Sequence, residues 1–197
     1  MVENSKKFTM LKKKQNVAIY MEGHIYSEYG KMGMGVLRYL ENKIVCVIDS
    51  KYSKTDISDH YSNLKPVPIV NNLESAIKLK AEVLILGIAP SGGKVPSDWY
   101  PVIKMALSKG LSIINGLHDL LQNRFSNLIS KKNQWIWDVR VPNFVPEIAT
   151  GKAALLNNKR LLMVGTDMAC GKMTTALEVL TWSKENKLKS GFIATGQ

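Results

Sequence analysis

Apolar runs rich in valine and isoleucine alternate with amphipathic stretches along most of the chain. The runs are nearly continuous, which is typical of strands buried on both faces of a parallel sheet. Between them apolar residues recur at helical spacing, as Leu73, Ala76 and Ile77 do. Asn71 or Asn72 can cap that helix, and the early Glu74 suits the positive end of its dipole. The pattern predicts strands at residues 16–22, 43–50, 67–70, 81–89, 111–116 and 134–141, and helices at 33–41, 71–80, 99–110 and 118–130.

This alternation of strands and helices predicts an α/β fold, because a parallel sheet with helical connections has both faces covered. Residues 16–142 are therefore expected to form a Rossmann-like domain with a doubly wound parallel sheet. Residues 1–15 precede it, with five lysines among the first fourteen residues, and are predicted to be a disordered basic tail. The stretch from Val141 to Lys152 carries two prolines, and residues 143–153 are interpreted as a linker.

A further strand–helix–strand pattern occupies residues 154–197. Residues 160–165 and 191–197 are predicted strands, and residues 172–190 between them are a predicted helix. One such unit cannot bury both faces of a sheet by itself. We therefore expect the start of a P-loop NTPase-like α/β domain whose remainder is absent. The alternative is that this segment docks on the first domain or on another subunit.

The turn from Gly165 to Thr175 is the strongest chemical signal in the sequence. A standard phosphate-binding loop reads G-x-x-x-x-G-K-[ST], with backbone N–H groups and a lysine around the phosphates and a hydroxyl on magnesium. Here five residues separate the glycines, and Met173 follows Lys172. An ordinary turn with a chance lysine is the competing interpretation, which the strand before and the helix after disfavour. The predicted phosphate or nucleotide site comprises Gly165, Thr166, Asp167, Gly171, Lys172, Met173, Thr174 and Thr175, with Thr174 as the candidate Mg²⁺ ligand.

A second ligand site is expected in the first domain, because doubly wound sheets bind ligands outside the carboxyl ends of their strands. The loop "APSGGK" offers free N–H groups and a lysine for an anion, and His118 is a candidate general acid or base. Asp49 is equally well explained as a turn former, and Asp119 as the cap of the following helix. The predicted contacts are Glu22, Asp49, Pro90, Gly92, Gly93 and Asp119.

Composition narrows the function classes. The first loop lacks G-x-G-x-x-G, which argues against a nicotinamide cofactor. The net charge is +11, but the basic residues are dispersed without a nucleic-acid motif, so a small anionic ligand is the simpler partner. Two cysteines make no disulfide framework, and no apolar run reaches the ~20 residues of a membrane span. No signal peptide or metal-ligand spacing is evident, and we expect a cytoplasmic homo-oligomer.

Several motifs in order carry a family resemblance: "KIVCVIDS", "PIVNNLESA", "LILGIAPSGGKVPSDW", "GLSIINGLHDLL", "IWDVRVP" and "VGTDMACGKMTTALEV". The chain after about Gln15 resembles the bacterial D-glutamate N-acetyltransferase-like family, whose members pair a Rossmann-like domain with a P-loop domain. The resemblance implies acetylation of a D-amino acid by acetyl-CoA, and a chain that continues beyond residue 197. It also implies that this segment alone is inactive.

Two alternatives stay open. The stretch "GTDMACGK" is similar to the GTD-x-x-x-GK loops of dethiobiotin synthetases, which implies an ATP-dependent ligase. That family places threonine directly after the lysine, where this chain has Met173. The other alternative is a nucleotide- or CoA-binding module without catalysis. Coenzyme A carries a pyrophosphate, so the Gly165–Thr175 loop suits acetyl-CoA as well as ATP.

Overall fold

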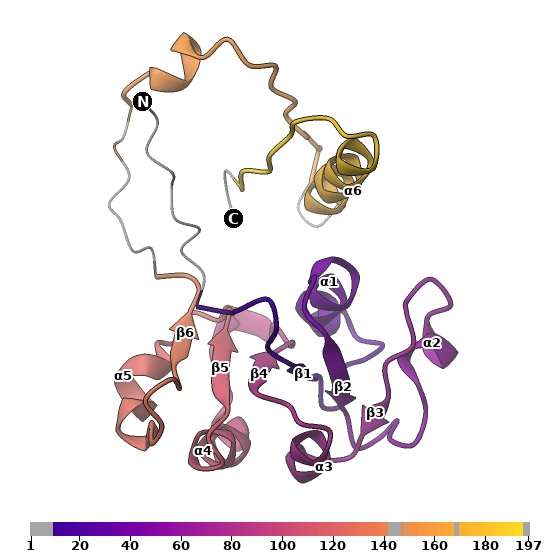
Figure 1. Cartoon of the computed structure of the whole chain (residues 1–197), viewed down its shortest axis with the longest axis vertical. Helices are drawn as coiled ribbons and strands as arrows, with labels where there is room; N and C mark the ends of the chain where they lie inside the picture. Colours follow the sequence, from indigo (N-terminus) through magenta and orange to yellow (C-terminus); the bar gives the residue numbers. More distant parts are fainter. Residues whose placement is uncertain (1–9, 142–146, 148, 168–169, 195–197) are drawn as a thin grey trace. The chain divides into compact units, whose positions relative to one another are not determined.

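A parallel sheet in the order β3-β2-β1-β4-β5-β6 organises the first part of the chain, as drawn in this computed structural model (Figure 1). The structure describes residues 10–141, 147, 149–167 and 170–194. β1 pairs with β2 on one side and with β4 on the other, so the winding reverses at β1. The strands are β1 (Val17–Tyr20), β2 (Ile44–Ile48), β3 (Ile69–Val70), β4 (Val83–Leu86), β5 (Ser112–Asn115) and β6 (Ile136–Asp138).

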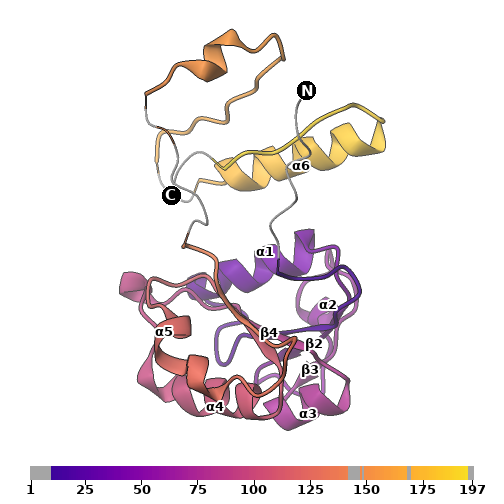
Figure 2. The ribbon, with the colours of Figure 1, turned by 60° about the vertical axis from the view of Figure 1, so that its left-hand side comes forward.

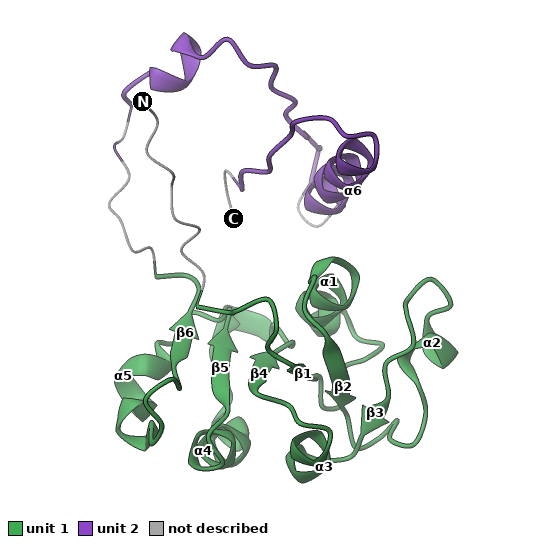
Figure 3. Ribbon diagram, viewed as in Figure 1, with its two compact units in different colours: residues 1–144 green, residues 145–197 purple. Residues whose placement is uncertain are grey.

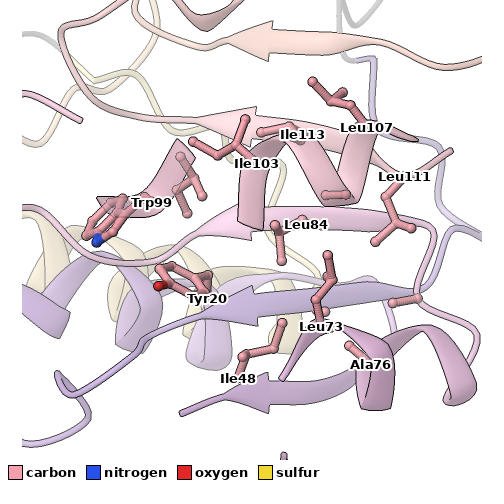
Figure 4. Packing of buried hydrophobic residues seen from close by; sticks show 14 of the residues in the cluster. Tyr20, Ile48, Leu73, Ala76, Leu84, Trp99, Ile103, Leu107, Leu111 and Ile113 are labelled. Carbon is pink, nitrogen blue, oxygen red and sulfur yellow. The ribbon is translucent and has the colours of Figure 1, made fainter. Parts of the chain in front are cut away.

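Helices cover both faces of this sheet. α1 (Lys31–Tyr39) lies on one face, and α3 (Leu73–Lys78) and α4 (Tyr100–Ser108) lie on the other (Figures 1 and 2). Side chains alternate along each strand, so β1 sends Ala18 and Tyr20 into the cluster beneath α3 and α4 (Figure 4). Val17 and Ile19 enter the opposite cluster, which α1 covers. The two faces therefore hold two separate apolar cores.

The α/β class and the Rossmann-like domain predicted from the sequence are confirmed. Each of the six strands predicted for this domain has a counterpart, and Asn72 caps α3 by accepting a hydrogen bond from the Ser75 N–H at 2.9 Å. The predicted helix at 118–130 is shorter: α5 (Leu121–Phe125) is followed by a 3-10 turn. The sequence pattern also missed α2 (Ile57–His60), one turn of helix closed by a capping box.

Residues at the start of the described chain are attached to this domain. The carbonyl oxygens of Lys12 and Gln15 accept hydrogen bonds from the Asn42 amide at 2.8 and 3.0 Å, and Leu11 is buried. Residues 10–15, assigned by the sequence to a disordered tail, thus contact the sheet domain here. Residues 1–9 lie outside the described residues.

The chain divides into two units, residues 1–144 and 145–197 (Figure 3). The second unit contains a 3-10 turn (Lys152–Leu155), which begins at the end of the predicted linker, and α6 (Lys172–Glu185). The two strands predicted around α6 were wrong for the described residues, since 160–165 and 191–194 form no strand. A parallel strand exists only where a neighbour supplies ladder hydrogen bonds. Leu161 and Val164 are instead 73% and 79% exposed, so no described residue covers most of their surface.

No helix within the described ranges is long and apolar enough to cross a membrane. Residues 142–146, 148 and 195–197, which include part of the predicted linker and of the last predicted strand, lie outside those ranges.

The packing of α1 on the sheet depends on Gly33. Its N–H donates to the Gly87 carbonyl at 2.7 Å, and a Cβ on Gly33 would lie 2.5 Å from the sulfur of Met21, which is fully buried. A Cβ on Gly35, in the same helix, would meet no heavy atom within 4 Å. Gly33→Ala is therefore expected to lower the free energy of unfolding by about 1–3 kcal/mol.

Gly35→Ala is the matched control, because alanine raises helix propensity by up to about 1 kcal/mol without a clash. Urea unfolding followed by tryptophan fluorescence measures both changes. Equal effects of the two substitutions would contradict the close approach of α1 to the sheet.

Candidate functional site

The glycine–lysine turn folds back on itself in the second unit. Gly171 adopts φ +95°, a left-handed conformation open to glycine, and α6 begins at the next residue. The Lys172 ammonium donates to the Asp167 carbonyl oxygen and lies 3.5 Å from the Cys170 sulfur. A Cβ on Gly165 would collide with that sulfur, so the first glycine lies beneath the returning loop. The turn thus brings Gly165, Asp167 and Lys172 together.

The start of α6 offers hydrogen-bond donors to an anion. The first N–H groups of any helix lack intrahelical acceptors and carry the positive end of the helix dipole. Here the first amide bonded back is that of Thr175, whose N–H and hydroxyl both donate to the Gly171 carbonyl at 2.9 and 3.1 Å. Thr166, Met173 and Thr174 are exposed. The Thr175 hydroxyl is therefore engaged, whereas that of Thr174 bonds to none of the residues that the structure describes.

The two cysteines sit in opposite environments. Burial raises the pKa of the Cys46 thiol to about 12. For the exposed Cys170 thiol, desolvation acts upward, but the hydrogen bond and charge of Lys172 outweigh it and hold the pKa below its ordinary value. The loop around Lys172 therefore favours negative charge, as a phosphate site requires.

In the first domain, the loop after β4 and the loop after β5 contact each other. The contacts involve residues that the sequence predicted for the ligand site of this domain. The His118 N–H donates to the Gly93 carbonyl at 2.8 Å, and the Asp119 carboxylate accepts from the Val95 N–H at 2.6 Å. Gly92 and Gly93 both have positive φ, and Pro90 precedes the 3-10 turn that they form. The structure therefore brings Gly93, His118 and Asp119 together, with the His118 side chain exposed.

Glu22 and Asp49 follow β1 and β2 but play different parts. The Glu22 carboxylate accepts from the N–H of Ser50 at 3.0 Å and from its hydroxyl. Asp49 is fully buried, and its Oδ1 accepts from the Lys51 N–H at 3.0 Å. Burial raises the pKa of the Asp49 carboxyl, an effect that the nearby N–H groups of Gly23 and Lys51 partly offset. Asp49 therefore stabilises the loop that follows β2, and its side chain has no exposed surface for a ligand.

A cavity of about 270 Å³ opens at the carboxyl ends of β1, β2 and β3, beside α3 and α4. Of the predicted residues of the first domain, only Glu22 lines it. Sequence reasoning treated Asn71, Asn72 and Glu74 as helix-start residues and did not assign Tyr20 or Asp98 to a site. Their positions in the sequence could have indicated the cavity, because Tyr20 ends β1 and the two asparagines follow β3, at the carboxyl ends of the strands. The polar lining consists of Tyr20, Glu22, Asn71, Asn72, Glu74 and Asp98.

Asp138 is a buried polar residue that the sequence did not single out. Its carboxylate accepts from the N–H groups of Leu121 and Gln122 at 3.1 and 2.9 Å, and from the Asn115 amide at 2.8 Å. It therefore caps α5 from the neighbouring strand. The expectation that Asp119 caps or opens this helix was wrong: the helix begins at Leu121, its N-cap residue has no side-chain bond, and Asp119 binds Val95 instead.

No cluster of His, Cys, Asp or Glu side chains in the described part of the chain is arranged to hold a metal ion. The candidate Mg²⁺ ligand Thr174 thus has no carboxylate cluster around it there.

Comparison with known proteins identifies relatives of both parts. Residues 50–142 match the family model "Domain of unknown function (DUF1611_N) Rossmann-like domain", and residues 147–197 match the "DUF1611_C P-loop domain". Two curated proteins named D-glutamate N-acetyltransferase are similar: one from Pseudoalteromonas sp is 43% identical over 125 residues, and one from Tritonibacter scottomollicae is 38% identical over 127. These alignments cover 62% and 64% of this chain but only 37% and 38% of the relatives.

The structure is also similar to a solved one. A crystal structure of a DUF1611 family protein from Anabaena variabilis matches with a TM-score of 0.86 at 41% sequence identity. The match covers 93% of this chain and 54% of that protein. This chain thus spans about half the length of the Anabaena protein and less of the curated relatives.

Proposed function

Because this chain belongs to the DUF1611 family, we propose that it supplies the Rossmann-like domain and the phosphate-binding loop of an N-acetyltransferase. The proposed reaction transfers the acetyl group of acetyl-CoA to the amine of a D-amino acid of the D-glutamate type. The names of the curated relatives support the reaction class. The observation in this chain that carries the proposal is the Gly165–Thr175 turn, where Lys172 and the first amides of α6 converge.

The phosphates of acetyl-CoA are the proposed occupants of that turn. Coenzyme A presents a pyrophosphate and a ribose phosphate, and a helix N-terminus with a lysine binds such anions through N–H donors and charge. The backbone of this phosphate-binding turn would be formed by Gly165, Thr166, Asp167, Gly171, Met173 and Thr174. The Thr174 hydroxyl would take the Mg²⁺ if the ligand were ATP.

Acetyl transfer requires a base, a carbonyl and a leaving thiolate. The acceptor ammonium loses a proton, and the free amine attacks the thioester carbonyl. The C–N bond forms, the C–S bond breaks, and coenzyme A leaves as a thiolate that takes up a proton. His118, exposed beside Gly93, is the proposed base. Glu22 and the Pro90–Gly93 loop remain proposed contacts of the first domain.

Binding by this chain and turnover in a chimera test the proposal. The chain is titrated with acetyl-CoA by calorimetry. A chimera is also made, in which this chain replaces the segment of the Pseudoalteromonas relative that aligns with it. We expect acetyl-CoA to bind, and the chimera to release CoA thiol with D-glutamate but not with L-glutamate. A chimera that melts like the parent yet releases no thiol, together with a chain that binds no acetyl-CoA, would contradict it.

The second candidate function is an ATP-dependent ligase, favoured by the sequence "GTDMACGK" around the loop. It is distinguished by its products: the same chimera would form ADP and phosphate only when ATP and Mg²⁺ are present. Release of the CoA thiol in the absence of ATP would exclude the ligase function.

A further inference from the structure

A largely buried tyrosine lines the cavity at the carboxyl ends of β1, β2 and β3, and its hydroxyl has no hydrogen-bond partner among the described residues. Tyr20 lines the cavity and is only 8% exposed, with its ring packed edge-on against Trp99 at 5.5 Å (Figure 4). Among the described residues its hydroxyl makes no hydrogen bond, and it is not one of the side-chain atoms closed off from solvent, so it can be reached from the cavity. A ligand in the cavity would supply that partner.

The charges around this hydroxyl are all negative. Glu22, Glu74 and Asp98 line the cavity, and no described lysine, arginine or histidine lines it, although the net charge of the whole chain is +11. Burial, followed by the carboxylates of Glu22 and Asp98, raises the pKa of Tyr20 to about 12. Both carboxylates therefore act on the hydroxyl, and the cavity favours a cation.

The lining selects an organic cation over a metal ion. The described residues hold no group of acids arranged to coordinate a metal, and Glu22 already accepts two hydrogen bonds from Ser50. Ile48, Val102 and Met105 add apolar walls that suit an alkyl chain. A protonated primary amine has three N–H donors, which matches three separate acceptors.

We propose that this cavity binds a small alkylammonium ion, whose charged nitrogen donates to the Tyr20 hydroxyl oxygen and to the carboxylates of Glu22 and Asp98. The site uses neither the Lys172 loop nor His118, and of the contacts proposed for the first domain it shares only Glu22, so either proposal can fail alone. The dicarboxylate D-glutamate is not its ligand, because three acids in the lining repel a net anion.

Calorimetric titration of the 197-residue chain tests the proposal with matched probes. Butan-1-amine is protonated at neutral pH, butan-1-ol has the same shape without the charge, and Mg²⁺ has the charge without the alkyl chain. We expect the amine to bind and neither the alcohol nor Mg²⁺ to compete with it. Equal binding of amine and alcohol, or displacement of the amine by equimolar Mg²⁺, would overturn the assignment.

Variants identify the acceptors. Tyr20→Phe keeps the ring against Trp99 and removes only the hydroxyl, and Asp98→Asn changes an exposed side chain, so both are expected to fold. Each should weaken amine binding about 10-fold. Glu28→Gln removes one negative charge outside the cavity, where Glu28 lies 3.8 Å from Lys31, and should leave the affinity unchanged. Equal weakening by Glu28→Gln, or no weakening by either cavity variant, would refute the proposed site.

Discussion

Replacing Lys172 by alanine is expected to weaken acetyl-CoA binding by roughly 10- to 100-fold, because a hydrogen bond to a charged group contributes about 1.5–3 kcal/mol. The ammonium is held over the loop by the Asp167 carbonyl, and Gly165 passes beneath the same side chains. It is therefore oriented before the ligand arrives, so little of the interaction is lost to ordering the side chain. Calorimetric titration of the two proteins with acetyl-CoA measures the change.

The control for this change is Lys189→Ala, which removes the same charge from an exposed position beyond the end of α6. It should leave the affinity within about 2-fold, because charges that are exposed and distant are screened by salt. If Lys172→Ala also left the affinity for acetyl-CoA and for ATP unchanged, the turn would not be a phosphate site. The proposed function would then lose its support in this chain.

Most of the first domain was predictable because its signals are local. The runs that became β1, β2 and β4 are continuous in β-branched and other apolar residues, and such runs are buried in parallel sheets. The cap of α3 was equally local, since Asn72 stands three residues before the amide that it binds. Most patterns that span a few residues were therefore interpreted correctly, although the single turn of α2 was missed.

The other features that the sequence did not reveal depend on residues far apart in the chain. The cavity joins Tyr20 at the end of β1 to Asp98 before α4, and no spacing in the sequence brings these two together. Leu161 and Val164 belong to a strand-like sequence pattern. A strand also needs a neighbouring strand to pair with, and the sequence of the segment itself cannot show whether one is present. The glycine–lysine turn could be singled out from the sequence because its residues lie within one short segment.

The cap of α5 is the clearest long-range feature, and its loss has the largest expected effect on stability. Asp138 is 7% exposed and joins β5, β6 and α5 through bonds to Asn115, Leu121 and Gln122. Asp138→Ala removes the acceptor and leaves three donors unpaired in or near the interior, each at a cost of about 1–3 kcal/mol. Because the neighbouring groups can partly relax after the substitution, we expect the free energy of unfolding to fall by about 3–5 kcal/mol.

Urea unfolding followed by tryptophan fluorescence measures this loss, since Trp137 neighbours Asp138 in β6. Asp98→Ala is the matched control: Asp98 is exposed and has no hydrogen bond within the described residues, so its loss should change stability by no more than about 0.5 kcal/mol. Asp138→Asn should fall between the two, because the amide keeps one accepting oxygen but turns a donor toward a backbone N–H. If Asp138→Ala unfolded at the same urea concentration as Asp98→Ala, its carboxylate would not stabilise α5.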